Sequence, residues 1–234
     1  TLDYVYRNQA QGSNRLGVLM DRQYLDAIGW RGIRQRKVHI EQTIQAAMHK
    51  LRAAGKPVHV LDIAAGHGRY VLDALTAADQ PDTIRLRDYS PLNVRAEQQL
   101  ITERGLAHLA RFDEVDAYQR ANYADLEPRP TLGIVSGLHE LFPDNDLIMQ
   151  SLLGLGDAIE PGGYLIYTGQ PWHPQLEMIA RCLTSHRQGQ AWVMRRRSQL
   201  EMDQLVAQAG FKKVQQLIDS DGIFTVSLAI KTGA

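Results

Sequence analysis

One short stretch limits what this chain can fold into more than any other. Residues 58–62 read VHVLD, a mainly apolar run that begins just after Pro57 and predicts a buried strand, and Ile63 comes next. The glycine-rich residues AAGHG follow, and an amphipathic helix is expected after them. A strand that meets a helix through glycines brings bare backbone close to a ligand, and the helix N-terminus aims unpaired N–H groups at it. The stretch therefore predicts an α/β fold with a nucleotide-type site.

Strand and helix signals alternate along the rest of the chain. Further strands are expected at residues 83–88, 110–114, 131–136, 164–168, 213–218 and 223–230. Helices are expected to about residue 78, from Ser90-Pro91 to Gly105, from Asp146 to Pro161, and from Ser198 to Gly210. The alternation predicts a doubly wound, mainly parallel sheet, and the last two strands, separated by Asp221-Gly222, predict a closing hairpin.

The first 56 residues show helical signals and no strong strand signal. Ile40, Ile44, Met48 and Leu51 are spaced as on one helix face. We expect a helical cap or lid over residues 1–56 and the main domain over 57–234. The first part has ten Lys and Arg residues against four acidic ones, a net charge of +6 in a neutral chain. This fits attraction to an anionic substrate or membrane surface, or a solvated helix face, better than a broad nucleic-acid surface.

The overall composition is that of a globular protein, with 44% hydrophobic and 22% charged residues. No apolar run approaches the roughly 18–20 residues of a membrane span, and Cys182 has no second cysteine for a disulfide. No His, Cys and Asp cluster has a metal-ligand spacing. We expect a cytoplasmic protein without a transmembrane segment or a metal. The start at Thr1 rather than methionine suggests a domain of something longer.

Three features bear on which nucleotide the glycine turn binds. Val71 stands where a nicotinamide dinucleotide site has its third glycine. Asp62 ends the first strand, where a carboxylate would repel a pyrophosphate and attract a positively charged ligand. A terminal antiparallel strand is also foreign to the usual dinucleotide fold. An NAD-dependent oxidoreductase therefore remains only as an alternative.

Residues 57–230 resemble class I S-adenosylmethionine-dependent methyltransferases. The resemblance rests on motifs that occur in the same order and at similar spacing: Asp62-x-Ala64-x-Gly66-x-Gly68, Asp88-Tyr89, Asp116-Ala117, Ser136-Gly137 and Pro161-Gly162-Gly163. It implies a Rossmann-like fold in which a mainly parallel seven-stranded sheet contains one antiparallel strand. It also implies S-adenosylmethionine as the cofactor.

The resemblance gives each of these motifs a role in holding the cofactor. The glycines let its amino-acid part lie against the backbone, Asp88 binds both ribose hydroxyls, and Tyr89 lies against adenine. The carboxylate of Asp116 accepts a hydrogen bond from the adenine amino group, and a backbone N–H of the Asp116-Ala117 motif reaches the ring. Ser136-Gly137 lies beside the methyl-bearing sulfonium.

A narrower resemblance involves three phrases, YLDAIGWRGIR at 24–34, LRDYSP at 86–91 and GQPWHPQ at 169–175. They look like the methyltransferase domain found C-terminal to an α/β-hydrolase in bifunctional bacterial proteins, which resemble lysophospholipases. The resemblance implies a bacterial, lipid-related setting with a fused or associated hydrolase. The chain itself contains no Gly-x-Ser-x-Gly nucleophile elbow.

The methyl acceptor is expected over the carboxyl ends of the fourth and fifth strands. His139 and His173 follow these strands and are the candidate general bases, because imidazole titrates near neutral pH. The alternative for each is a structural histidine that donates to a backbone carbonyl. Glu140 is a candidate to bind an acceptor amine or to orient His139; the alternative is an acid at a helix start. Trp172 is a candidate to shield the pocket from water; the alternative is a core residue.

The N-terminal helices are expected to fold over this opening. Tyr6, Arg31 and Arg34 are then candidates to contact the substrate, the two arginines if it carries phosphate or carboxylate. The cluster Arg195-Arg196-Arg197 precedes the Ser198 cap and is expected to be solvated. The leading function is methylation of an oxygen or nitrogen on a small or lipid-like molecule. The alternative from another class is a non-catalytic module that binds S-adenosylmethionine or S-adenosylhomocysteine and regulates a lipid hydrolase.

Overall fold

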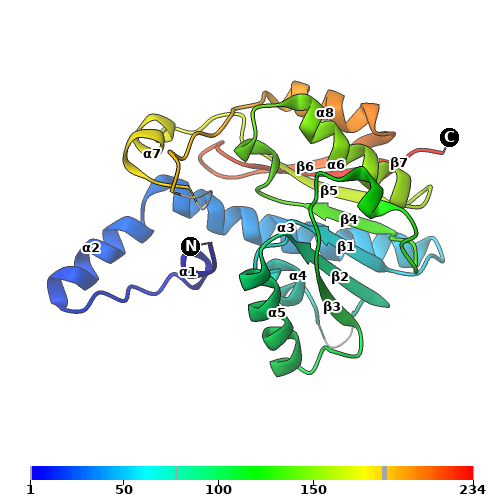
Figure 1. Ribbon diagram of the computed structural model, residues 1–234, viewed down its shortest axis with the longest axis horizontal. Coiled ribbons are helices and arrows are strands. Elements are labelled where there is room, and N and C mark those ends of the chain that lie inside the picture. Colours follow the sequence, from blue (N-terminus) through cyan, green and yellow to red (C-terminus); the bar gives the residue numbers. More distant parts are fainter. Residues whose placement is uncertain (1, 77–78, 186–188, 234) are drawn as a thin grey trace.

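A computed structural model describes residues 2–76, 79–185 and 189–233. Its strands are β1 (His59–Ile63), β2 (Thr83–Asp88), β3 (Ala110–Glu114), β4 (Leu132–Val135), β5 (Tyr164–Gly169), β6 (Phe211–Ile218) and β7 (Thr225–Lys231). Its helices are α1 (Leu2–Arg7), α2 (Arg15–Leu25), α3 (Ile28–Ala53), α4 (Arg69–Asp73), α5 (Pro91–Glu103), α6 (Asn145–Ala158), α7 (Leu176–Cys182) and α8 (Gln199–Gln208), with 3-10 turns η1 (Arg120–Tyr123) and η2 (His139–Leu141). Figure 1 shows one sheet with helices on both of its faces.

The strands form a seven-stranded sheet in the order β3-β2-β1-β4-β5-β7-β6. The pairs β1–β2, β1–β4, β2–β3 and β4–β5 are parallel. Only β7 runs against its neighbours, since it pairs antiparallel with both β5 and β6. The expected sheet with one antiparallel strand is therefore confirmed. The carboxyl ends of β1, β2, β4 and β5 lie at the same end of the sheet, which is called its carboxyl edge below.

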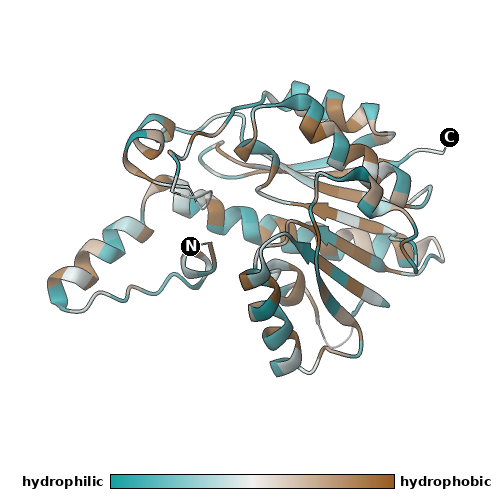
Figure 2. Ribbon diagram, viewed as in Figure 1, coloured by the Kyte–Doolittle hydropathy of each residue, from teal (hydrophilic) through white to brown (hydrophobic). Residues whose placement is uncertain are grey.

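Two apolar cores hold the helices against the sheet. One face is covered by α3, α4 and α5, and its core includes Ile40, Ile44 and Leu51 of α3. The other face is covered by α6, α8 and η1, with Leu152 and Tyr123 in its core. The inner strands are buried on both sides, which explains their nearly continuous apolar sequences (Figure 2).

Several element boundaries differ from those expected. The helix expected to reach about residue 78 ends at Asp73 within the described residues, and residues 77–78 lie outside them. Asp144, not Asp146, caps α6, because its side chain accepts from the Asp146 N–H. Ser90 is the N-cap residue of α5, as expected, but its side chain makes no cap hydrogen bond, and its N–H donates to Asp88. Helix α7 had no clear sequence signal and was not expected.

The N-terminal helices lie at the carboxyl edge of the sheet. Val5 and Ile33 form a third, smaller core with Phe224 of the β6–β7 connection, so α1 and α3 contact the end of the sheet. Helix α2 extends away from the body (Figure 1). Within the described residues, no helix is both long and apolar enough to cross a bilayer.

Candidate functional site

The glycine turn after β1 has a backbone that ordinary side chains rarely adopt. Ala64, Gly66 and Gly68 have φ values of 51°, 59° and 54°. A Cβ on Gly68 would lie 2.7 Å from Leu86 Cδ1, whereas a Cβ on Gly66 would meet nothing within 4 Å. Packing against β2 therefore requires Gly68, and Gly66 leaves open space for a ligand beside the turn.

Asp88 fastens the end of β2 to this turn. Its Oδ2 accepts from the Gly66 N–H at 2.9 Å. Its Oδ1 accepts from the Ser90 N–H at 2.9 Å and from Asn93 Nδ2 at 3.1 Å. Since a carboxylate oxygen can accept two hydrogen bonds, Oδ2 keeps one accepting position.

Asp62 is completely buried at the carboxyl end of β1, and neither of its oxygens has a hydrogen-bond partner within the described residues. Burial raises the pKa of Asp62 well above the ordinary value; the nearby Tyr70 hydroxyl opposes this shift and the Asp88 carboxylate adds to it. The Tyr70 side chain of α4 lies beside Asp62, and its hydroxyl is also buried without a partner of good geometry. Unpaired buried polar groups are costly, so this arrangement is suited to a polar ligand.

A buried ion pair lies across the end of β4 from this acid. Arg36 of α3 and Glu140 of η2 approach to 3.3 Å, and both are almost completely buried. The Arg36 guanidinium also lies over the Phe224 ring at 5.0 Å and would be 3.2 Å from a Cβ on Gly137. Arg36 Nε and the Ser136 hydroxyl have no hydrogen-bond partner in the described part of the chain.

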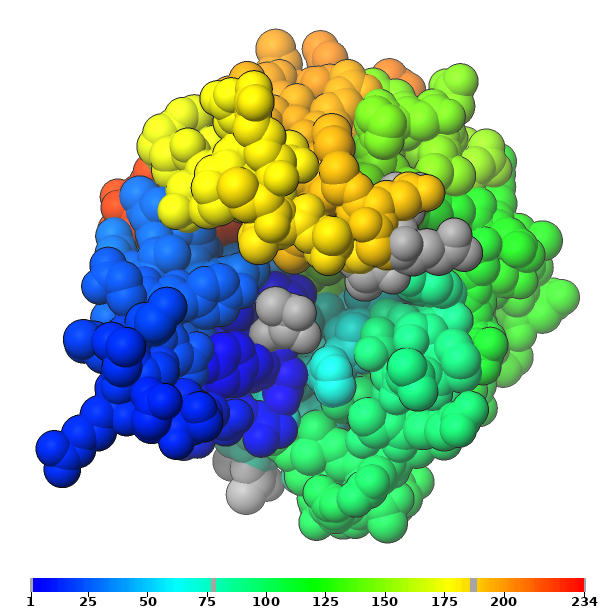
Figure 3. Space-filling model, turned by 60° about the vertical axis from the view of Figure 1, so that its left-hand side comes forward, coloured from blue at the N-terminus to red at the C-terminus, as the bar shows by residue number. Residues whose placement is uncertain are grey.

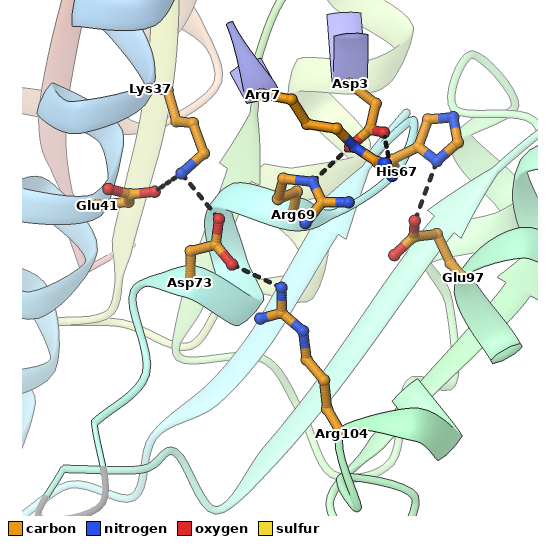
Figure 4. Close-up of polar contacts among 9 residues, drawn as sticks. All are labelled: Asp3, Arg7, Lys37, Glu41, His67, Arg69, Asp73, Glu97 and Arg104. Atoms are coloured by element: carbon orange, nitrogen blue, oxygen red, sulfur yellow. Dashed lines mark hydrogen bonds and ion pairs between the residues drawn. The ribbon is translucent and has the colours of Figure 1, made fainter. Parts of the chain in front are cut away.

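A network of ion pairs joins α1, α3, α4 and α5 around the glycine turn (Figure 4). Asp3 of α1 pairs with Arg69, the first residue of α4. His67 of the turn lies 3.1 Å from Glu97 of α5, and this contact raises the pKa of His67. The remaining contacts involve Lys37 with Glu41 and Asp73, Arg104 with Asp73, and Arg7 with Asp3. Helix α1 is thereby attached directly to the candidate site.

The other cofactor candidates lie after β2 and β3. Tyr89 is 56% exposed. The Asp116 carboxylate is exposed and accepts from the Tyr118 N–H at 2.9 Å, while Ala117 is buried and its carbonyl accepts from the Tyr123 hydroxyl. A ladder bond from the Val115 N–H to the Asp88 carbonyl brings the two loops to the same edge.

His139 is buried, and its ring is engaged inside the protein. Its Nε2 lies 2.9 Å from the Ser151 hydroxyl, and that hydroxyl donates to the Ile148 carbonyl. The imidazole must therefore donate through Nε2. Burial lowers the pKa of His139 to about 3, with the Arg197 charge contributing. This environment favours the structural alternative for His139.

His173 is nearer to the N-terminal helices than to β4. Its Nδ1 accepts from the Gln175 N–H at 3.1 Å, so a neutral ring carries its proton on Nε2. That nitrogen would be 2.7 Å from a Cβ on Gly29, which places the ring against the start of α3. Burial lowers the pKa of His173, and Asp219 opposes this shift. Trp172, next to it, is 44% exposed.

The three substrate candidates of the N-terminal part do not lie at one place, because Arg31 and Arg34 are close together and Tyr6 lies elsewhere. Tyr6 lies under the Lys37 ammonium at 5.9 Å and near Tyr70. Arg34 donates to the Leu25 carbonyl at 2.9 Å, and Arg31 donates to the Asp26 carbonyl and faces Asp221. The two arginines stabilise the α2–α3 junction, and only Tyr6 is placed beside the glycine turn.

The residues around the carboxyl edge surround a hollow in the surface. Figure 3 shows this face, with the blue N-terminal helices on one side, the yellow segment that contains α7 above, and cyan to green residues after β1 and β2 opposite. No group of three or more His, Cys, Asp or Glu residues within the described ranges could hold a metal ion. The buried polar atoms of Asp62, Arg36 and Ser136 that lack partners among the described residues make this edge a candidate site for a polar ligand.

Sequence reasoning overlooked Arg36, Tyr70 and Arg197. Arg197 was expected to be solvated but is 5% exposed, and it donates to the His139 and Phe142 carbonyls and to Asn145 Oδ1. Its burial has no local signal, because its partners lie more than fifty residues away. For Tyr70, the position directly after the glycine turn was an available clue.

Comparisons with known proteins place this geometry in context. Residues 1–231 match a family described as "Putative methyltransferase". The uncharacterized protein YnbC of Escherichia coli (strain K12) is 59% identical over 231 residues, which are 99% of this chain. The chain spans 40% of the length of that relative.

Solved structures share the fold. A possible exported protein of Bordetella parapertussis has a TM-score of 0.77 at 18% identity, over 100% of this chain and 80% of that one. The magnesium protoporphyrin IX methyltransferase ChlM of Synechocystis PCC 6803, with bound S-adenosylhomocysteine, has a TM-score of 0.63 at 16% identity, over 98% and 93%. An O-methyltransferase family protein of Burkholderia thailandensis has a TM-score of 0.62 at 14% identity, over 92% and 63%. The Rossmann-like methyltransferase fold is thus confirmed.

Proposed function

The chain belongs to this methyltransferase family, and we propose that it transfers a methyl group from S-adenosylmethionine to an oxygen or nitrogen of a small or lipid-like molecule. S-adenosylmethionine is also the cofactor in a solved structure of ChlM, which has the same fold. The fold supports the cofactor class, whereas the acceptor is inferred from the chain's own residues and charge.

The observation that carries the proposal is the set of unpaired polar groups at the carboxyl edge. In the part of the chain that the structure describes, both side-chain oxygens of Asp62 and the Nε–H of Arg36 are buried without a hydrogen-bond partner. The methionine part of the cofactor carries an ammonium, a sulfonium and a carboxylate. The Asp62 carboxyl therefore suits the positive groups of the cofactor, and the Arg36 guanidinium suits its carboxylate. Binding would give both buried groups the polar partners they lack.

The remaining cofactor residues fit the adenosine part. Asp88 keeps an accepting position for a ribose hydroxyl, and its bond to the Gly66 N–H fixes the turn. Tyr89 presents an aromatic side chain beside it, and Asp116-Ala117 lies on the neighbouring loop. We propose these residues, with Ala64, Gly68, Ser136 and Gly137, as the cofactor site.

When bound, the cofactor supplies an electrophilic methyl group that needs little further activation, so the chain's residues mainly position the acceptor. Among the proposed catalytic residues, Glu140 positions the loop after β4 through its ion pair with Arg36. His173 is proposed as the general base, a role in which its Nδ1 must first release the hydrogen bond from the Gln175 N–H. His139 acts through the loop it stabilises. Tyr6, Arg31, Arg34 and Trp172 are proposed to contact the substrate from the cap over residues 1–56.

Calorimetry with S-adenosylmethionine, S-adenosylhomocysteine and NADH tests the cofactor assignment. We expect both adenosyl compounds to bind and NADH not to bind. Incubation with labelled S-adenosylmethionine and a bacterial lipid and metabolite extract then tests catalysis. Label in an extracted compound supports a methyltransferase, while binding without transfer would favour the regulatory module. A folded sample that binds neither adenosyl compound would refute the proposal.

A further inference from the structure

Helix α2 turns its apolar side away from its own protein. Leu16, Leu19 and Met20 are spaced three and four residues apart and share one face, and they are 67%, 66% and 66% exposed. The opposite side carries Asp21, which accepts from the Tyr4 hydroxyl and from the Gln11 N–H. Amphipathic surface helices normally bury the apolar face, so this orientation indicates an external partner.

A second group of exposed apolar side chains lies at the same edge of the molecule. Trp172, just before α7, is 44% exposed, and Met178 in α7 is 45% exposed. Val193, in the segment after α7, is 67% exposed. The start of α7 is close to the start of α3, since the Gly29 N–H lies 3.4 Å from Gln175 Oε1. The N-terminal helices and the segment that contains α7 therefore meet, and both lie around the hollow in Figure 3.

The two segments that carry these apolar side chains contain more arginines than acidic residues. Residues 1–34 contain five arginines and three acidic residues, and residues 172–197 contain five arginines and one acidic residue. Arg15 and Arg22 flank the apolar face of α2, and no ion pair within the described residues neutralises them or Arg196. Exposed apolar side chains bordered by arginines are the pattern of helices that lie in the interface of an anionic bilayer.

We propose that this face, defined by Leu16, Leu19, Met20, Trp172, Met178 and Val193, docks onto an anionic lipid surface. The apolar side chains enter the boundary between headgroups and acyl chains, while Arg15, Arg22 and Arg196 contact the phosphates. The hollow then opens toward the membrane, so a lipid-like acceptor reaches the site without crossing water. The inference rests on the proposed function for the identity of the acceptor and on the surface alone for docking.

Vesicle sedimentation tests the docking without any methyl donor. We expect the protein to bind phosphatidylcholine–phosphatidylglycerol vesicles, to bind vesicles of phosphatidylcholine alone much less, and to be released by high salt. The triple variant Leu16→Ser/Leu19→Ser/Met20→Ser should lose roughly tenfold or more of the binding, because buried apolar area and charge both contribute. Arg15→Gln/Arg22→Gln should reduce binding only to the anionic vesicles.

Val214→Ser/Ile218→Ser is the matched control, because these β6 side chains are also about half exposed but lie on another part of the molecule. Unchanged vesicle binding by this control and weakened binding by the α2 variant support the proposal. Absence of wild-type binding to anionic vesicles, or equal loss in both variants, would overturn it. A wild-type dimer in light scattering that becomes a monomer in the α2 variant would also overturn it, because the face would then bind a second copy of the chain. Cofactor calorimetry on the same samples reports separately on the proposed function.

Discussion

At the scale of single residues, the burial of Asp62 suits a ligand but lowers the stability of the ligand-free protein at neutral pH. Burial raises its pKa, so the folded state holds the carboxyl proton at a pH where the unfolded chain has released it. The contribution to stability is therefore greatest below the ordinary pKa of 3.8 and is lost as the pH rises through the raised folded pKa.

Asp62→Asn should remove the loss of folding stability that the Asp62 carboxyl causes as the pH rises. We expect the ligand-free variant to be at least as stable as the wild type in urea at neutral pH, with a flatter dependence of stability on pH. Its affinity for S-adenosylhomocysteine should fall about tenfold to a hundredfold, since a hydrogen bond to a charged group is worth roughly 1.5–3 kcal/mol. Asp113→Asn, at a partly exposed acid of β3, is the control. Unchanged calorimetric affinity in Asp62→Asn would contradict the role of this carboxylate.

If Arg36 binds the carboxylate of the cofactor, its removal should weaken only those ligands that carry this carboxylate. The double variant Arg36→Met/Glu140→Gln removes both charges together, so no unpaired charge is left buried. We expect it to bind S-adenosylmethionine about tenfold to a hundredfold more weakly, but to bind the decarboxylated analogue as the wild type does. A purely structural role would weaken both ligands equally, and that result in calorimetry would refute the assignment.

At the scale of elements, Arg197 connects the segment before α8 to the loop after β4. It is buried and donates to two carbonyls of the His139–Phe142 turn. Arg197→Met should therefore lower the free energy of unfolding by about 3 kcal/mol, because charged hydrogen bonds in a buried site are lost. Arg196→Met, at the exposed neighbouring residue, should change it by less than about 0.5 kcal/mol. Equal urea midpoints for the two variants would show that the turn does not depend on Arg197.

The elements that the sequence predicted are those with a strong local pattern. Strands at 83–88 and 110–114 occur where expected because apolar and polar residues alternate in each, with Ile84 and Leu86 buried in the first and Ala110 and Phe112 in the second. Helix α4 was predicted too long, because the residues after Asp73 have helical composition but Thr76 forms an isolated antiparallel bridge with Asp79 instead. Asp62, Gly66 and Asp88 come together as expected because parallel strands end at one edge. Arg36 and Arg197 could not be predicted, since each is buried only by segments far away in the sequence.

At the scale of the whole molecule, the parallel strands bring the polar loops together and the N-terminal helices close them from one side. The attachment of α1 through Asp3 and Arg69 makes the cap part of the glycine turn's surroundings. The same edge carries the exposed apolar face and the positive charge, so ligand binding and docking share one side of the molecule. The opposite edge of the sheet, with pocket-lining residues such as His59 and His108, lies away from both.

The position of β7 affects how the protein is made. This strand lies between β5 and β6, although it is the last of the seven in the chain. While a ribosome is still synthesising residues 225–231, β5 has an open edge and β6 has no partner in the sheet. The nascent chain therefore depends on protection from edge-to-edge association until that strand has emerged. The sheet is complete only when β7 has inserted between β5 and β6.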